Sequence, residues 1–138
     1  MLKKISLQGE EVSFSFMLNS RIVVIRGESG SGRTFLFNTW KAYAVSRRNN
    51  ILFFNYTTAQ DLYNVLQSKR DCLFVIDNAD ILLTDELRAY IAQDLTNQFV
   101  IIGRCVDGLG VGRSGLAEVH IDVDKRKGTL VYPYLKKR

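Results

Sequence analysis

Hydrophobic and polar residues alternate near both ends of this chain, and short continuous apolar runs lie between. Over residues 5–18, apolar side chains occupy every second position in two runs that Gln8-Gly9-Glu10 separates. Alternation of this kind is typical of strands with one buried face, and a break that contains glycine allows a tight turn. The segment is therefore predicted to form a β-hairpin.

Four continuous apolar runs follow, and segments with helical spacing separate them. The apolar runs are residues 22–25, 51–54, 73–76 and 99–102, and the helical segments are 35–46, 59–68 and 85–95. Short runs rich in β-branched residues are typical of strands buried on both faces, as in a parallel sheet covered by helices. The pattern predicts an α/β protein with right-handed crossovers.

The last third of the chain departs from this pattern. Residues 107–115 contain four glycines, which favours a mobile loop over a packed element. Residues 116–124 alternate like a strand with one wet face, and 129–134 form a last strand in which Pro133 marks an edge or an exit. With 138 residues and no low-complexity linker, we expect a single domain, 1–138.

Composition narrows the class of protein. The chain is 46% hydrophobic and 24% charged, and its apolar runs are too short to span a bilayer. Polar residues interrupt its first segment before the apolar core of a signal peptide forms. Cys72 and Cys105 lie far apart, and His120 is the single histidine, so no zinc-site pattern is present. We expect a cytoplasmic protein with buried thiols and no membrane contact.

Positive charge gathers in short clusters, and the two nearest the end of the chain, 125–127 and 136–138, have no obvious helix terminus to complement. The formal net charge is +5. Such clusters can bind nucleic acid or another acidic partner, although a solvated turn and tail is the favoured interpretation.

One glycine-rich stretch follows the first buried run and reads Gly27-Glu28-Ser29-Gly30-Ser31-Gly32-Arg33-Thr34. It matches the phosphate-loop template G-x-x-x-x-G-K-[ST] in spacing and in its place between strand and helix, with Arg33 at the lysine position. The loop would surround phosphate oxygens with backbone N–H groups. Arg33 would place its charge at the β- and γ-phosphates, and Thr34 would give its hydroxyl to Mg²⁺. A planar guanidinium is a poor substitute for a compact ammonium in positioning the γ-phosphate, so binding is favoured over hydrolysis.

A carboxylate ends the third buried run. Asp77 follows residues 73–76, as in a Walker B strand, where it would hold Mg²⁺ at the carboxyl edge of the sheet. Asn78 occupies the position at which many ATPases carry a water-activating glutamate, and an amide cannot accept that proton. Asp80 is then either the base for the attacking water or the N-cap of the next helix, and the sequence favours neither.

An arginine ends the fourth buried run. Arg104 follows residues 99–102 and Gly103, at the same predicted edge of the sheet. It is either a sensor of the γ-phosphate or a surface arginine at a strand end, and the two interpretations have equal weight.

The motifs at 27–34, 73–80 and 99–104 together resemble those of the additional-strand P-loop NTPases, which include the AAA+ and STAND families. The resemblance covers nearly the whole core and implies a three-layer P-loop NTPase fold. Its sheet would be mainly parallel and five-stranded, in the order 5-1-4-3-2, with the N-terminal β-hairpin and a C-terminal antiparallel strand added. No helical lid with a second sensor arginine is present in the sequence.

The resemblance implies ATP and Mg²⁺ as ligands, and no GTP-reading N-K-x-D segment is found. We therefore expect a compact, stand-alone domain that binds Mg²⁺ and ATP, with weak or partner-dependent hydrolysis. The alternative is a degenerate P-loop fold that acts as a protein- or nucleic-acid-interaction module without nucleotide turnover.

Overall fold

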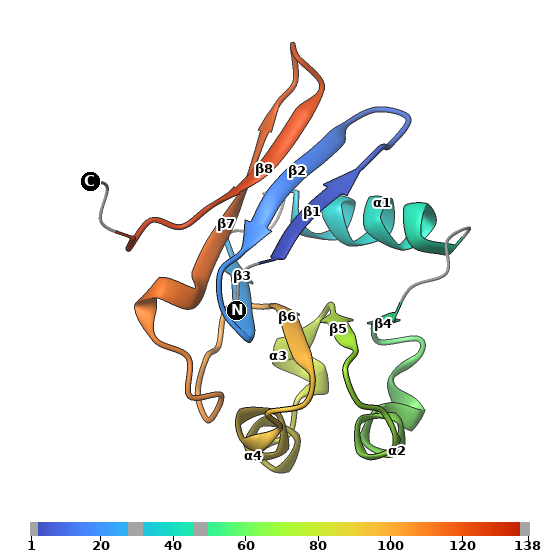
Figure 1. Cartoon of the computed structure of the whole chain (residues 1–138), viewed down its shortest axis with the longest axis vertical. Coiled ribbons are helices and arrows are strands. Elements are labelled where there is room, and N and C mark those ends of the chain that lie inside the picture. The colour runs from blue at the N-terminus through green and yellow to red at the C-terminus, as the bar shows by residue number, and fades with distance from the viewer. Residues whose placement is uncertain (1–2, 28–31, 46–49, 136–138) are drawn as a thin grey trace.

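The structure, a computed structural model, describes residues 3–27, 32–45 and 50–135. The strands are β1 (Lys3–Leu7), β2 (Ser13–Leu18), β3 (Ile22–Arg26), β4 (Ile51–Phe54), β5 (Leu73–Ile76), β6 (Gln98–Ile102), β7 (Leu116–Asp122) and β8 (Lys127–Val131). The helices are α1 (Arg33–Val45), α2 (Leu62–Ser68), α3 (Ala79–Leu82) and α4 (Asp85–Gln93), with short 3₁₀ turns at Ala59–Asp61 and Arg113–Gly115. These strands form one sheet in the order β1-β2-β8-β7-β3-β6-β5-β4 (Figure 1).

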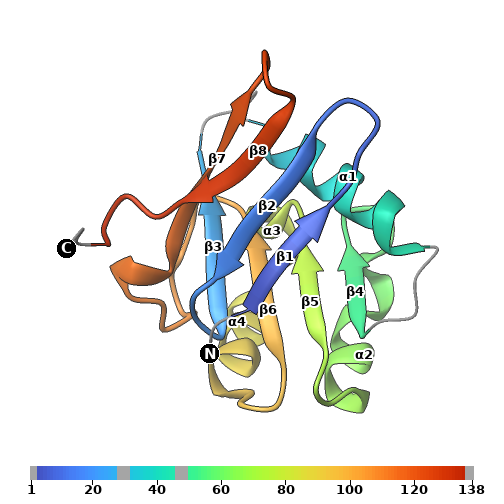
Figure 2. The same cartoon turned by 45° about the horizontal axis from the view of Figure 1, so that its top comes forward.

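Five neighbouring strands, from β7 to β4, are parallel. Numbered along the chain, they stand in the order 5-1-4-3-2, which is the expected order. Their arrows point the same way in Figure 2, so their carboxyl ends share one edge of the sheet. Val23, Val24 and Ile25 in β3 are fully buried, because helices or other strands cover both faces. Four of the five parallel strands, β3, β4, β5 and β6, are the predicted apolar runs, and the fifth, β7, is the segment that alternation predicted to be a strand.

The sheet is larger than the predicted five strands, because the hairpin and the last strand extend it to eight. β1 and β2 are antiparallel, and β8 is antiparallel to β7. A short parallel contact joins the two pairs, with Ser13 opposite Lys127 and Phe14 opposite Gly128. These four strands curl over α1 (Figures 1 and 2). The five parallel strands, the hairpin and the C-terminal antiparallel strand are all present, and together they form one continuous sheet.

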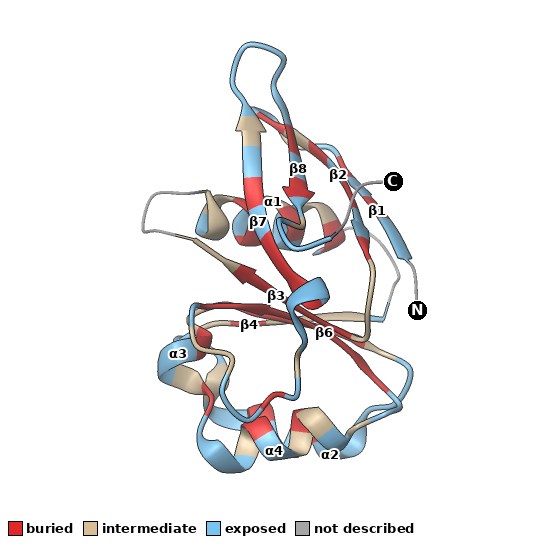
Figure 3. Cartoon of the chain, turned by 90° about the vertical axis from the view of Figure 1, so that its left-hand side faces the viewer, coloured by how far each residue is buried: buried red, intermediate tan, exposed pale blue. Residues whose placement is uncertain are grey.

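Two hydrophobic clusters lie on the two faces of the sheet. On one face, the Trp40 ring of α1 lies edge-on between Phe16 of β2, at 5.4 Å, and Phe53 of β4, at 5.9 Å. On the other face, α2, α3 and α4 cover the parallel strands (Figure 3), and Leu66 and Ile91 are fully buried there. The helix that follows the glycine-rich loop is thus held between parallel and curled strands.

The glycine-rich segment 107–115 is a loop of turns and a short 3₁₀ element, and part of it is packed; its mobility stays a prediction. Gly108 adopts a φ of 77°, and Leu109 is fully buried in the cluster beneath α4. The buried Arg88 of α4 secures the segment, because its guanidinium donates hydrogen bonds of 3.0 Å to the carbonyl oxygens of Cys105 and Asp107. The two thiols that were expected to be buried, Cys72 and Cys105, are half-buried and free.

Candidate functional site

The glycine-rich loop leaves the end of β3 and meets the first turn of α1. Gly27 and Gly32 have φ angles of 146° and 98°, a region that residues with a side chain rarely adopt. A Cβ on Gly32 would also lie 2.9 Å from Cδ1 of Ile121. Both positions therefore use the conformational freedom that the template assigns to glycine. The predicted phosphate-contacting residues Glu28, Ser29, Gly30 and Ser31 lie outside the described residues.

The first turn of α1 presents backbone donors at the end of this loop. The N–H of Leu36 donates to the carbonyl oxygen of Gly32 at 2.9 Å, which is the first hydrogen bond of the helix. The N–H groups of Arg33, Thr34 and Phe35 come before it and have no carbonyl acceptor within the helix. Together with the positive end of the helix dipole, they favour an anionic group at this position.

Asp77 brings a buried carboxylate to the same edge. Its N–H donates to the carbonyl oxygen of Phe54 at 2.8 Å, which extends the pairing of β4 with β5 by one residue. Its side chain is only 5% exposed. Among the residues that the structure describes, the one hydrogen bond to this carboxylate comes from the N–H of Asn78, at 2.9 Å. A buried carboxylate with so few partners is costly unless a cation compensates its charge.

Asp80, in α3, connects this helix to the segment after β6 through side-chain hydrogen bonds. Its carboxylate accepts hydrogen bonds of 2.9 Å from the N–H groups of Arg104 and Cys105. It is not the N-cap of either neighbouring helix, because Asn78 precedes α3 and Thr84 caps α4 through its Oγ1. The N-cap interpretation was therefore wrong, and the base remains a prediction.

Gly103 makes this contact possible. A Cβ at this position would lie 2.8 Å from Oδ1 of Asp80 and 3.2 Å from Cβ of Ala79. The first distance is shorter than real Cβ contacts allow, so a larger residue would displace the carboxylate. The close approach requires glycine at the end of β6.

A small cavity connects these elements. Its volume is about 160 Å³, and its lining residues are Arg33, Thr34, Asp77, Asn78, Ala79, Asp80, Ile81, Ile102 and Gly103. The structure thus brings together the end of the predicted phosphate loop, the predicted Walker B carboxylate and Asp80, because parallel strands deliver their carboxyl ends to one edge. Ligand pockets usually occupy about 300–1,000 Å³, so this cavity suits only part of a nucleotide.

Arg104 lies apart from that group. Its exposed side chain lines a second cavity of about 310 Å³, hereafter the β7 cavity, together with Arg26, Gly27, Leu116, Ala117, Glu118, Pro133 and Tyr134. The adjacent Gly103 lines the small cavity, so the two cavities adjoin at the end of β6. Arg104 thus lines a different cavity from Thr34 and Asp77, and its role as a γ-phosphate sensor remains a prediction.

Several lining residues were not predicted from the sequence. Arg26 immediately precedes the loop motif, which was the available signal for that residue. Glu118 belongs to an alternating strand, and Tyr134 lies in the segment after the last strand. Nothing in the pattern of either segment indicated a binding residue. Glu118 reaches the site because β7 pairs with β3 and places Glu118 opposite Arg26.

The residues of the small cavity fit a nucleotide-bound Mg²⁺. In the described part of the chain, no group of three or more His, Cys, Asp and Glu side chains could hold a metal ion. Magnesium, however, prefers hard oxygen ligands and usually takes only one or two from the protein, with water and phosphate oxygens as the others. The Thr34 hydroxyl and the buried Asp77 carboxylate would supply such ligands, and the cation would compensate the buried charge.

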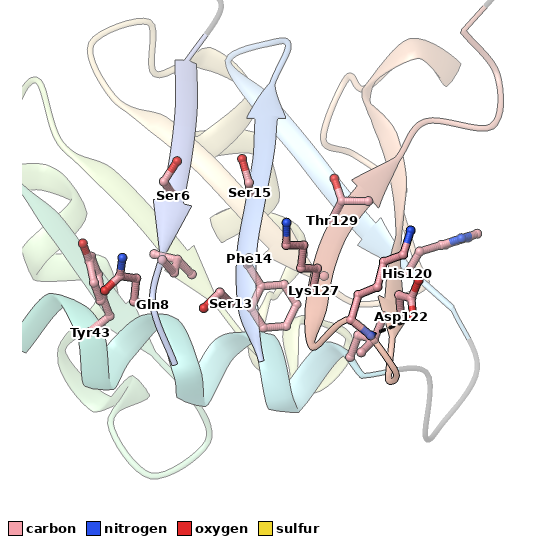
Figure 4. A pocket seen from close by; sticks show the side chains of 14 residues that line it. Ser6, Gln8, Ser13, Phe14, Ser15, Tyr43, His120, Asp122, Lys127 and Thr129 are labelled. Carbon is pink, nitrogen blue, oxygen red and sulfur yellow. Dashed lines mark hydrogen bonds between the residues drawn. The ribbon is translucent and has the colours of Figure 1, made fainter. Parts of the chain in front are cut away.

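A larger cavity lies elsewhere, on the curled strands. It occupies about 680 Å³, and the side chains of Ser6, Ser15 and Thr129 point to the same side of these strands (Figure 4). None of the residues predicted to bind nucleotide lines it. Its size therefore does not make it the candidate site, because the buried carboxylate of Asp77 and the end of the predicted phosphate loop line the small cavity.

Comparison of the chain with protein-family models, with curated proteins and with solved structures finds no significant match. Of the described helices, none has the length and apolar character needed to cross a membrane.

Proposed function

We propose that this protein binds a nucleoside triphosphate with Mg²⁺ on a three-layer P-loop NTPase fold, and that the nucleotide is ATP, as the resemblance implies. One observation carries the proposal: Arg33 and Thr34 at the end of the glycine-rich loop line the same cavity as the buried Asp77. The parallel strands in the order 5-1-4-3-2 agree with that fold. We also propose a cytoplasmic location.

Each group would have a separate task in binding. The N–H groups in the first turn of α1 would donate to phosphate oxygens, and Arg33 would neutralise their charge. Thr34 and Asp77 would hold Mg²⁺, which would compensate the negative charge of the phosphates. The cavity of about 160 Å³ would take the terminal phosphates and the ion, and would leave the nucleoside outside.

The same residues argue for slow hydrolysis. Asn78 cannot accept a proton from water, and the Asp80 carboxylate already accepts hydrogen bonds from the N–H groups of Arg104 and Cys105. To orient a water molecule, Asp80 would have to exchange or share these bonds. Turnover would then be weak, or would depend on a partner protein that supplies charge to the transition state.

Isothermal titration calorimetry with ATP tests this proposal. We expect Arg33→Ala to weaken binding by about tenfold or more, because bonds to charged groups contribute about 1.5–3 kcal/mol. Asp77→Asn should weaken binding when Mg²⁺ is present and change little when EDTA replaces it. Arg126→Ala and Asp124→Asn, which alter exposed residues of the β7–β8 turn, are the matched controls. No heat from the wild type at millimolar Mg²⁺ and ATP would refute the proposal.

A second candidate function is nucleic-acid binding by the β7–β8 turn. Lys125, Arg126 and Lys127 are exposed there, and the turn projects beyond the body of the molecule (Figure 1). Such a contact would depend on phosphates, so its affinity should fall steeply with salt. Fluorescence anisotropy with a labelled oligonucleotide at two salt concentrations tests it, and an Arg126→Ala variant with unchanged affinity would count against it.

A further inference from the structure

The β7 cavity, lined by Arg26, Gly27, Arg104, Leu116, Ala117, Glu118, Pro133 and Tyr134, has the chemistry of a nucleobase site. We propose that it holds the adenine base of the nucleotide, with Tyr134 as the stacking surface and Glu118 as the acceptor for the amino group of the base. The assignment rests on the proposed nucleotide binding and adds to it the part of the ligand that gives selectivity.

The position of the β7 cavity relative to the small cavity follows from the residues that line each of them. Gly27, where the loop begins, lines the β7 cavity, and Arg33, where it ends, lines the small cavity. On the neighbouring strand, the consecutive residues Gly103 and Arg104 line the small cavity and the β7 cavity respectively. The two cavities are therefore neighbours at the end of β6. A triphosphate seated in the smaller one leaves its nucleoside outside, beside the larger one.

The apolar wall of the β7 cavity suits a flat heteroaromatic ring. Leu116 and Ala117 are buried, and Pro133 and Tyr134 complete the wall. The Arg113 guanidinium lies 5.7 Å from the centroid of the Tyr134 ring, a cation–π contact that holds the ring in place. Tyr134 is nevertheless 52% exposed, so its ring is fixed but remains accessible. Aromatic side chains in this condition are common stacking surfaces for bases.

The polar groups favour a neutral base over a further phosphate. A phosphate subsite would carry donors and cations only, whereas Glu118 adds a carboxylate to Arg26 and Arg104. In the β3–β7 register, Glu118 and Arg26 lie directly opposite each other, which sets an acceptor beside a donor. Adenine presents the complementary pair, because its amino group donates and the adjacent N7 accepts. Guanine has two acceptors on that edge, and hypoxanthine has no amino group.

Calorimetry that compares ATP with inosine triphosphate isolates the base from the phosphates. The wild type should bind ATP about tenfold more tightly, as expected for a hydrogen bond to a charged acceptor. Glu118→Gln should bring the ratio close to one, because its amide can donate to the oxygen that replaces the amino group. Tyr134→Ala should weaken both nucleotides by about tenfold and leave their ratio unchanged. Glu11→Gln and Tyr56→Ala, at exposed positions away from the β7 cavity, are the matched controls.

The outcomes separate this inference from the proposed function. Normal wild-type binding of ATP, with an unchanged ratio in Glu118→Gln or an unchanged affinity in Tyr134→Ala, would overturn the base site and leave triphosphate binding intact. Tighter binding of GTP than of ATP would overturn the adenine assignment. A wild type that binds no nucleotide would overturn both. Glu118 is exposed and Tyr134 is half-exposed, so neither substitution should unfold the protein. Circular dichroism of each variant checks that the fold is retained.

Discussion

The contact between Gly103 and Asp80 allows a test in which a mutation changes the sign of its effect. In Gly103→Ala, the new Cβ would lie 2.8 Å from Oδ1 of Asp80, so the carboxylate must move away from the N–H groups of Arg104 and Cys105. Each of these hydrogen bonds contributes about 1 kcal/mol. Weakening both should lower the free energy of unfolding by about 1–2 kcal/mol. Alanine also lowers the conformational entropy of the unfolded chain, which should raise the free energy of unfolding by about 0.4–1 kcal/mol. We expect a net loss of about 1 kcal/mol.

The same mutation should not destabilise a protein that already lacks the carboxylate. Asp80→Ala alone should cost about 2 kcal/mol, because both N–H groups lose their acceptor. In that background, Gly103→Ala no longer displaces a carboxylate, although Cβ of Ala79 remains 3.2 Å away, so the change should be neutral or stabilising by up to about 1 kcal/mol. The coupling energy between the two sites should therefore be about 1–2 kcal/mol.

Urea unfolding of the wild type, the two single variants and the double variant, without nucleotide, measures this coupling. For a chain of this size, 1 kcal/mol corresponds to about 3–5 °C in Tm, which gives an independent reading. Additivity within about 0.5 kcal/mol would refute the reasoning, because it would mean that the two residues do not act on one contact.

Three further predictions concern the site, the sheet and pH. Arg33→Lys should raise ATP hydrolysis several-fold with little change in affinity, measured by phosphate release, because a compact ammonium positions the γ-phosphate better. Gly128→Ala should destabilise the fold by about 1–3 kcal/mol in urea unfolding, because its Cβ would collide with the buried Phe14 ring, whereas Gly112→Ala has open space and should not. Burial alone would raise the pKa of Asp94, but hydrogen bonds from neighbouring side chains outweigh it and lower that pKa. Its contribution to stability should therefore be lost as the pH falls below about 4, and Asp94→Asn should flatten that decline in the free energy of unfolding.

The parallel core and the meeting of the motifs were predictable from the sequence. Buried β-branched runs such as 22–25 identify central strands, and parallel strands must end at a common edge, so Asp77 was expected near Thr34. These inferences use local pattern and one rule of sheet geometry. They required no knowledge of which loops pack on which helices.

Long-range partners were not predictable in the same way. Alternation identified the last strand but not its pairing with β2, since periodicity marks a buried face and says nothing of the neighbour. The helical pattern did not single out Arg88, which is buried and donates a hydrogen bond to the carbonyl oxygen of Cys105. Asp80 reaches N–H groups 24 and 25 residues away, in a segment without periodic structure. Such contacts depend on the tertiary structure and leave no local signature.

The pairing of β2 with β8 has a consequence for the order of folding. Phe14 lies opposite Gly128, so the hairpin can join the sheet only after more than a hundred further residues have been synthesised. Until then, β1 and β2 are an isolated two-stranded unit, which is marginally stable by itself in water. The parallel strands β3, β4, β5 and β6 come earlier and enclose one side of α1. Closure over its other side is therefore the late step on the ribosome, and in a dilute refolding experiment the fluorescence of Trp40 should report it.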